Sequence, residues 1–176
     1  MSEKILLKKT FSVYASDLHL ATMIFPFIDK EIKNGAIIKP ILEKNISKSI
    51  NKVINNVGLN LEIKKKIKKL DWNETNIQKI KQTLNSIEEK LDKNIKVNII
   101  ILGSNIFIEK VNKLIDLWAK ANLDKIEKRN VNINIINCYS YENNKNIQEI
   151  LLKHEFLLKT TGIESIYKEK ELKKAN

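Results

Sequence analysis

The sequence is poor in the residues that several common kinds of protein chemistry require. It has one Cys, two His, four Gly and two Pro among 176 residues. A lone Cys, Cys138, cannot form an internal disulfide, and the ligand spacings of zinc sites are absent. The longest apolar runs, such as Ile99–Leu102, are far shorter than a membrane span. We therefore expect no bound metal, no other cofactor and no insertion into a membrane.

The start of the chain indicates no export signal. The segment MSEKILLKKTF has neither a long apolar stretch nor a small-residue cleavage site. Together with the single Cys, this favours the cytoplasm as the location. The length favours one domain over residues 1–176, with a frayed tail over 168–176.

Both glycine-rich phosphate-binding patterns are missing, since the chain has no G-x-x-x-x-G-K-[ST] and no G-x-G-x-x-G. The turn at Gly103 and Ser104 could present backbone N–H groups to an anion, but an ordinary helix start explains it more simply. Nucleophilic catalysis would need Cys138 beside His154, which the sequence does not require. We therefore predict no catalytic residue and a packed, inert Cys138.

The net charge of +11 raises the alternative of a nucleic-acid-binding protein. Two observations weaken it. The basic residues are 31 Lys and only one Arg, Arg129, whereas groove and phosphate recognition favours Arg. In the densest Lys cluster, Leu59–Leu70, the apolar residues form one helical stripe and the lysines cover the rest, as on a solvated helix.

Apolar segments of two kinds alternate along the chain. Short β-branched runs predict strands at residues 10–15, 36–43, 96–104 and 130–138, with a short one at 70–72. Helical spacing predicts helices near residues 18–32, 46–57, 59–70, 77–91, 108–123 and 146–158. Asn73 is the expected N-cap of the fourth helix, Pro26 should kink or break the first, and Pro40 favours an edge strand. This alternation predicts a three-layer α/β fold, a parallel or mostly parallel sheet of about five strands with helices on both faces.

Two parts of the chain together resemble a known family. The first helix, with Pro26 and Phe27, leads through Gly35 into a strand. Later, a buried strand ends near Cys138 and the following helix reaches His154 near its close. This order resembles the MEDS family, the methanogen/methylotroph DcmR-like sensory domains, over roughly residues 10–160. The family's Cys-x-Tyr pattern is imperfect here, because Ser140 stands where Tyr is expected.

The resemblance implies a RecA-like α/β core without the phosphate-binding loop. It also implies a non-catalytic sensory or regulatory domain in signal transduction or transcription regulation, acting through a small-molecule ligand or a protein partner. Nucleic acid is the weaker alternative partner. An enzyme of undescribed type at the carboxyl edge of the strands and a homo-oligomer also stay open.

The expected binding site lies where strands end and helices begin, because ligands of open parallel sheets bind outside the carboxyl ends of the strands. Caps and turns favour the same residue types, so a purely structural explanation stays open. The candidate ligand- or partner-binding residues are Tyr14, Ser16, Asp17, Glu43, Trp72, Asn73, Gly103, Ser104, Tyr139, Tyr141 and, from the resemblance, His154.

Overall fold

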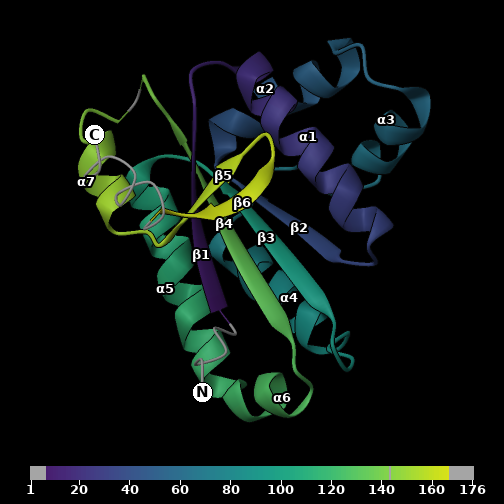
Figure 1. The fold of residues 1–176 in the computed structure, drawn as a ribbon, viewed down its shortest axis with the longest axis vertical. Helices are drawn as coiled ribbons and strands as arrows, with labels where there is room; N and C mark the ends of the chain where they lie inside the picture. The colour runs from purple at the N-terminus through teal and green to yellow at the C-terminus, as the bar shows by residue number, and fades with distance from the viewer. Residues whose placement is uncertain (1–6, 143, 167–176) are drawn as a thin grey trace, which may run out of the picture.

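A computed structural model describes residues 7–142 and 144–166 and forms a sheet flanked by helices (Figure 1). In chain order the elements are β1 (Leu7–Tyr14), α1 (Asp17–Lys33), β2 (Ile37–Leu42), α2 (Lys44–Asn56), α3 (Leu61–Lys68), α4 (Ile77–Glu88), β3 (Lys96–Leu102), α5 (Asn105–Ala121), α6 (Leu123–Lys128), β4 (Asn132–Ser140), α7 (Ile147–Leu152), β5 (Phe156–Lys159) and β6 (Gly162–Ser165).

The six strands lie in the order β2-β3-β4-β1-β5-β6. The first five are parallel to one another, and β6 pairs antiparallel with β5. Read from β5, the parallel strands run 5-1-4-3-2, an order that differs from those of the dinucleotide-binding and flavodoxin-like sheets. The predicted mostly parallel α/β fold is confirmed.

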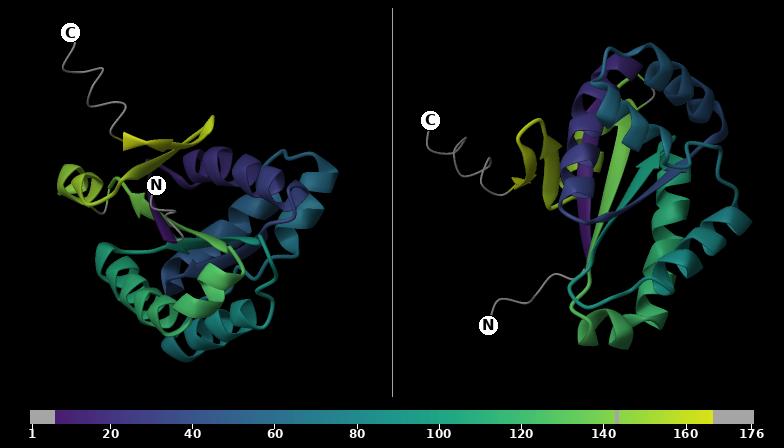
Figure 2. Two further views of the ribbon diagram at one scale, coloured as in Figure 1. Left: turned by 60° about the horizontal axis from the view of Figure 1, so that its bottom comes forward. Right: turned by 90° about the vertical axis from the view of Figure 1, so that its right-hand side faces the viewer.

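Helices cover both faces of the sheet (Figure 2). Helices α1, α2 and α3 pack on one side, here called the α1 face, and α4, α5, α6 and α7 on the other, the α5 face. The connection from β1 to β2 crosses two strands in one direction, whereas the later connections run in the opposite direction. Because such crossovers are right-handed, the reversal places α1 on one face and α4, α5 and α7 on the other, while α2 and α3 stay packed beside α1.

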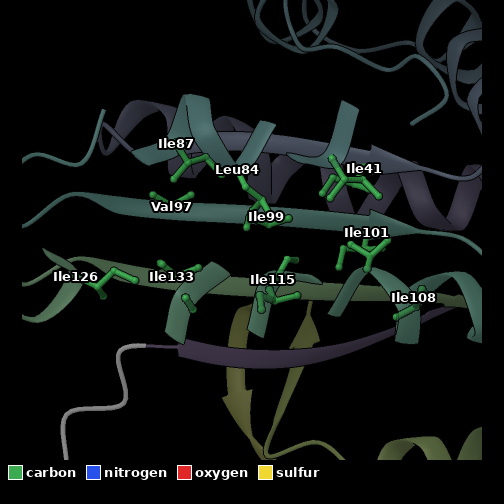
Figure 3. Packing of buried hydrophobic residues seen from close by; sticks show 14 of the residues in the cluster. Ile41, Leu84, Ile87, Val97, Ile99, Ile101, Ile108, Ile115, Ile126 and Ile133 are labelled. Carbon is green, nitrogen blue, oxygen red and sulfur yellow. The ribbon is translucent and has the colours of Figure 1, made fainter. Parts of the chain in front are cut away.

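The central strands β3 and β4 are buried on both sides, as their Ile-rich runs predicted. In β3, Ile99 and Ile101 join the core of the α5 face, while Ile100 and Leu102 join the core of the α1 face. Figure 3 shows the α5-face cluster, in which side chains of α4 and α5 fill the space over the strands. Burying each such side chain contributes about 1.5–3 kcal/mol relative to exposure.

Two predictions from proline positions have different outcomes. Strand β2, which contains Pro40, is an edge strand as predicted, since it pairs only with β3 among the described strands. Helix α1 continues from Asp17 to Lys33 through Pro26, so the predicted interruption does not end the helix there.

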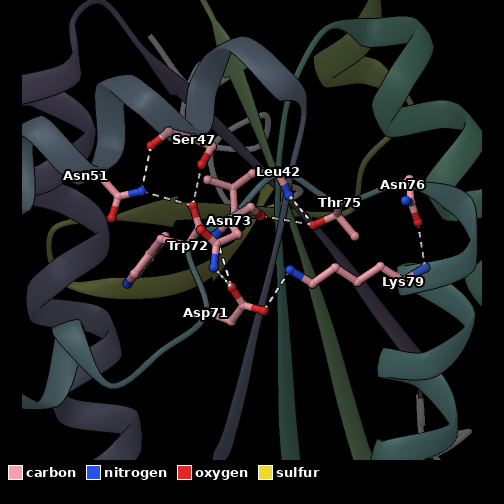
Figure 4. A network of polar contacts seen from close by, with 9 residues as sticks. All are labelled: Leu42, Ser47, Asn51, Asp71, Trp72, Asn73, Thr75, Asn76 and Lys79. Atoms are coloured by element: carbon pink, nitrogen blue, oxygen red, sulfur yellow. Dashed lines mark hydrogen bonds and ion pairs between the residues drawn. The ribbon is translucent and has the colours of Figure 1, made fainter.

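The prediction of a strand at residues 70–72 is wrong. The pairing there is a single bridge between Glu74 and Leu42. The carbonyl of Trp72 instead accepts hydrogen bonds from Ser47 Oγ (2.6 Å) and Asn51 Nδ2 (3.2 Å), as Figure 4 shows. Side chains of α2 thus occupy a backbone acceptor that a sheet ladder would need.

The predicted N-cap of the fourth helix is also wrong. Helix α4 begins at Ile77, and its N-cap is Asn76, whose Oδ1 accepts from the Lys79 N–H at 2.8 Å. Asn73 instead donates to Asp71 Oδ1 through both its backbone and its side-chain nitrogen. Two Asn residues suited to capping lie three positions apart, and the nearer one starts the helix.

The last predicted helix is too long. Helix α7 ends at Leu152, and Phe156–Lys159 is strand β5, which pairs in parallel with β1. His154 therefore lies just beyond the helix, not on it. At the preceding strand, β4 continues to Ser140, so Cys138 lies inside the strand and not at its end.

Two expectations concern the ends of the chain and the membrane. The predicted frayed tail at 168–176 lies outside the described residues. Over residues 7–142 and 144–166, no helix combines the length and the apolar character needed to cross a bilayer.

Candidate functional site

At the carboxyl edge, the predicted residues around β3 form helix caps. Ser104 Oγ accepts from the Phe107 N–H at the start of α5 (3.3 Å). The carboxylate of Glu43 accepts from the backbone N–H of Ser104 (2.6 Å) and from its hydroxyl (3.1 Å). The chain's own carboxylate thus occupies the N-terminus of α5, where an external anion would otherwise bind.

The glycine of this turn is closely packed. A Cβ atom built on Gly103 would lie 2.5 Å from Phe107 Cδ1 and 3.1 Å from Glu43 Cβ. The absence of a side chain therefore lets β3 turn into α5 against its neighbours, which is a structural role.

The predicted residues after β1 and β4 meet one another. The Tyr141 N–H donates to the Tyr14 carbonyl at 2.8 Å, which extends the pairing of these two strands. Tyr14 is buried, and burial raises the pKa of its hydroxyl. Ser16 caps α1 by accepting from the His19 N–H (3.1 Å). In contrast, Asp17 and Tyr141 are exposed, Tyr141 at 63%.

Trp72 and Asn73 belong to the packed connection between α3 and α4 (Figure 4). The Trp72 ring is buried edge-on to Phe25, and its Nε1–H donates to the Ile67 carbonyl at 2.8 Å. Asn73 bonds Asp71, whose carboxylate also contacts Lys79 Nζ at 2.8 Å. These contacts hold the connection between α3 and α4 in place. Because the Trp72 indole is buried, it does not contribute to a surface where a ligand or partner could bind.

Tyr139 and His154 come together on the α5 face, beside a cleft of about 250 Å³ between α5 and α7, here called the α5/α7 cleft. Their rings pack edge to face with centroids 5.9 Å apart, and both contact Phe11. His154 Nδ1–H donates to the Ile150 carbonyl (2.8 Å), which leaves Nε2 to accept from Asn137 Nδ2 (3.1 Å). Burial lowers the pKa of His154, in keeping with a neutral ring.

Cys138 and His154 lie on opposite faces of the sheet. Cys138 is 0% exposed in the core of the α1 face, whereas His154 contacts the aromatic rings of the α5 face. Burial raises the pKa of the Cys138 thiol to about 12. This arrangement cannot supply the thiolate and adjacent base of a Cys–His nucleophile. Among the described side chains, no three from His, Cys, Asp and Glu gather as metal ligands.

The largest of the described cavities lies at the other end of the sheet. It has a volume of about 660 Å³ and lies on the α1 face, over the amino-terminal ends of β1, β3 and β4. Helix α1 forms one wall through residues 26, 27, 30 and 31, and the turn between β5 and β6, residues 159–163, forms the other. We call this cavity the α1 groove. Its size is within the range of small-molecule sites.

A row of polar side chains crosses the three strands beneath the α1 groove. Asn98 of β3 is in register with Asn134 of β4, which is in register with Lys8 of β1. Asn134 Nδ2 donates to Asn98 Oδ1, and Asn98 Nδ2 donates to Glu31 Oε2, each at 2.8 Å. Lys96 Nζ lies 2.7 Å from the same Glu31 oxygen. The chain of hydrogen bonds thus ends on an ion pair.

Sequence reasoning missed this row, although the sequence carries a signal for it. Asn98 interrupts the apolar run of β3, Asn134 lies between two buried Ile residues of β4, and Glu31 lies on the buried stripe of α1 with 4% exposure. Buried polar side chains are costly unless paired, so their presence on core-facing positions indicates a shared network. The sequence carries no signal for the opposite wall at residues 159–163, because the apolar residues 156–158 before it continue a helical spacing.

Three comparisons with known proteins give no relative from which a function could be inferred. A scan against protein families, a search of curated proteins and a search of solved structures each found no match. The resemblance to the MEDS family therefore stays a prediction. The α1 groove, built on the mostly parallel sheet of an α/β fold, is the feature from which a function can be argued.

Proposed function

We propose that this chain is a non-catalytic sensory or regulatory domain that binds a small molecule in the α1 groove. The observation that carries the proposal is the groove itself. It combines a volume of about 660 Å³ with a floor of buried, mutually hydrogen-bonded polar side chains. Ligand sites in proteins typically have this size and a few polar groups held in fixed positions.

The floor of the groove is organised before any ligand binds. Glu31 can only accept hydrogen bonds when it is ionised, so it orients the amide of Asn98, which in turn orients Asn134. Asn134 lines the groove, whereas Asn98 is 0% exposed behind it. A ligand that meets an already oriented side chain loses less free energy to ordering, which supports a binding role for this surface.

The walls of the groove suggest how occupancy could be read by a partner. One wall belongs to α1 and the other to the turn between β5 and β6, far apart in the sequence. A ligand between them would add a further link between two surface elements that already share the core of the α1 face. A protein partner that contacts either element would then bind the occupied and empty forms with different affinity.

Support for a non-catalytic role comes from the chemistry of the reactive side chains. The Cys138 thiol is buried and its pKa is raised. Both ring nitrogens of His154 form hydrogen bonds within the chain, to Asn137 and to the Ile150 carbonyl. Neither residue lines the α1 groove. The groove offers binding groups, namely lysines, amides and hydroxyls, in place of an activated nucleophile.

The proposal is tested by filling the groove. Thr160 is exposed in the turn between β5 and β6 and lines the groove, so Thr160→Trp should block it. Thr22→Trp, at an exposed position of α1 outside the groove lining, is the matched control. Native mass spectrometry after incubation with a low-molecular-mass cell extract should show a retained small molecule on the wild type and the control, but not on Thr160→Trp. Circular dichroism should show that all three proteins are folded.

Two results would contradict the proposal. In the first, no small molecule from the extract is retained by the wild-type chain. In the second, Thr160→Trp retains the same molecule to the same extent as Thr22→Trp, so that the molecule binds outside the groove.

A further inference from the structure

The α1 groove is strongly biased toward positive charge. Four lysines line it, namely Lys8, Lys30, Lys96 and Lys159, whereas Glu31 is the one acidic residue among its described lining residues. The lysines come from β1, α1, β3 and β5, so the folded sheet gathers them from four separate elements. An excess of cations in a concave site attracts anions more strongly than the same charges on an open surface.

The basic composition of the whole chain does not account for this bias. Over the full sequence, 32 basic residues face 21 acidic ones. The α5/α7 cleft follows that balance, with three lysines and two carboxylates in its lining. Two of those lysines are paired, Lys9 with Asp116 (2.7 Å) and Lys153 with Glu109 (4.0 Å). The α1 groove also holds two paired lysines, Lys96 with Glu31 and Lys159 with Glu164, but its lining keeps an excess of three lysines over carboxylates, against one in the α5/α7 cleft.

Three of the four lysines of the groove contact a neighbouring side chain. Lys96 contacts the buried Glu31 carboxylate, and Lys159 Nζ lies 3.2 Å from Glu164. Lys8 Nζ lies over the Phe156 ring, 4.2 Å from its centroid. Each contact restricts a flexible side chain at the groove, so an anion that binds there meets cations that are already ordered.

The volume exceeds what a single phosphate needs, and the four lysines come from four elements around the groove, so these charges can contact different parts of one ligand. On this basis we infer that the ligand of the α1 groove is a small polyanion, a molecule with two or more phosphate or carboxylate groups. The inference rests on the proposed ligand-binding function. Thr160 places a hydroxyl group on the same wall, where it can donate to the ligand's oxygens, whereas the Thr161 hydroxyl already donates to Glu164 (2.7 Å).

The inference is tested with inorganic pyrophosphate and citrate as probes, titrated into the full chain by calorimetry at low ionic strength. The groove variant is Lys30→Gln with Lys159→Gln. The matched control is Lys65→Gln with Lys68→Gln, two exposed lysines of α3, because it removes the same net charge. We expect saturable binding of at least one probe to the wild type and the control, and at least roughly tenfold weaker binding to the groove variant.

Three outcomes would overturn the inference. If neither probe binds while the Thr160→Trp experiment still identifies a groove ligand, the groove binds a small molecule of another charge class. If both double variants lose binding equally, the anions respond to net charge and not to the groove. A single-stranded oligonucleotide could bind far more tightly than either probe. If Lys65→Gln with Lys68→Gln then weakens oligonucleotide binding as much as the groove variant does, the basic surface recognises nucleic acid.

Discussion

Cys138 shows how the surroundings of a residue decide its chemistry. In the sequence it lies 16 positions before His154. Because side chains alternate along β4, Cys138 points to the α1 face and only its neighbour Tyr139 points to the face that holds His154. Cys138 belongs to the hydrophobic core of the α1 face, while its neighbour Tyr139 belongs to the core of the α5 face and contacts His154. A difference of one residue in strand register thus separates an inert thiol from an aromatic cluster.

We predict that Cys138→Ser lowers the free energy of unfolding by about 1–2 kcal/mol, because a hydroxyl replaces a buried, weakly polar thiol. Urea unfolding measures the change. As a second readout, a bulky thiol reagent should label the native wild type slowly and the unfolded chain quickly. Fast labelling of the native protein would show that the thiol is exposed.

His154 should make stability depend on pH. Burial, together with Lys9 and Lys153, lowers its pKa in the folded chain, so around and below about pH 6.5 the unfolded chain binds more protons. The stability contributed by the neutral ring is therefore complete above about pH 6.5 and is lost as the pH falls through the folded-state pKa. Urea unfolding at about pH 7 and about pH 5 should show a smaller loss on acidification for His154→Gln than for the wild type. An equal loss in both proteins would show that other groups cause it.

At the scale of elements, local sequence patterns predicted those strands and helices whose formation depends on the burial of their own residues. The first strand, α1, β2, β3 and β4 follow from apolar runs and spacing, because their burial matches their own periodicity. Residues 156–158 did not, because three apolar residues after a helix continue its pattern equally well. They become a strand because they pair with β1. The paired residues Thr10 and Phe156 are 146 positions apart in the chain.

The turn from β3 to α5 allows a matched pair of glycine substitutions. Gly103→Ala should lower the free energy of unfolding by about 1–3 kcal/mol, because its Cβ would collide with Phe107. Gly58→Ala is the control, since a Cβ there meets no atom within 4 Å, and its stability should stay within about 1 kcal/mol of the wild type. Thermal or urea unfolding measures both. Equal stability of the two variants would mean that the turn tolerates a side chain.

On the scale of the whole molecule, the fold class was predictable and the best candidate site was not. The general rule for parallel sheets pointed to the carboxyl edge, where the structure finds caps, a buried Tyr14 and a carboxylate on the N-terminus of α5. The α1 groove lies at the amino-terminal ends of the strands. Its walls exist only because β5 and β6 extend the sheet beside α1, a consequence of tertiary structure that no local pattern contains.

The same arrangement predicts that the chain does not hydrolyse ATP. It lacks a glycine-rich phosphate loop, and Glu43 already occupies the N-terminus of α5, where its charge would repel phosphates. Phosphate release from Mg-ATP should equal the rate without protein. A measurable rate that Ser104→Ala abolishes would contradict both this prediction and the structural role given to that turn.

The most direct test of the account is to map where a small molecule binds. Amide NMR spectra of the ¹⁵N-labelled chain, with and without a low-molecular-mass cell extract, report on both edges of the sheet at once. We expect the signals of Asn132, Asn134, Thr161 and Gly162 to shift, because these residues line the α1 groove. The signals of Ser16, Ser104 and Tyr141 at the carboxyl edge should stay in place. Shifts confined to the carboxyl edge, or no shifts at all, would contradict the account.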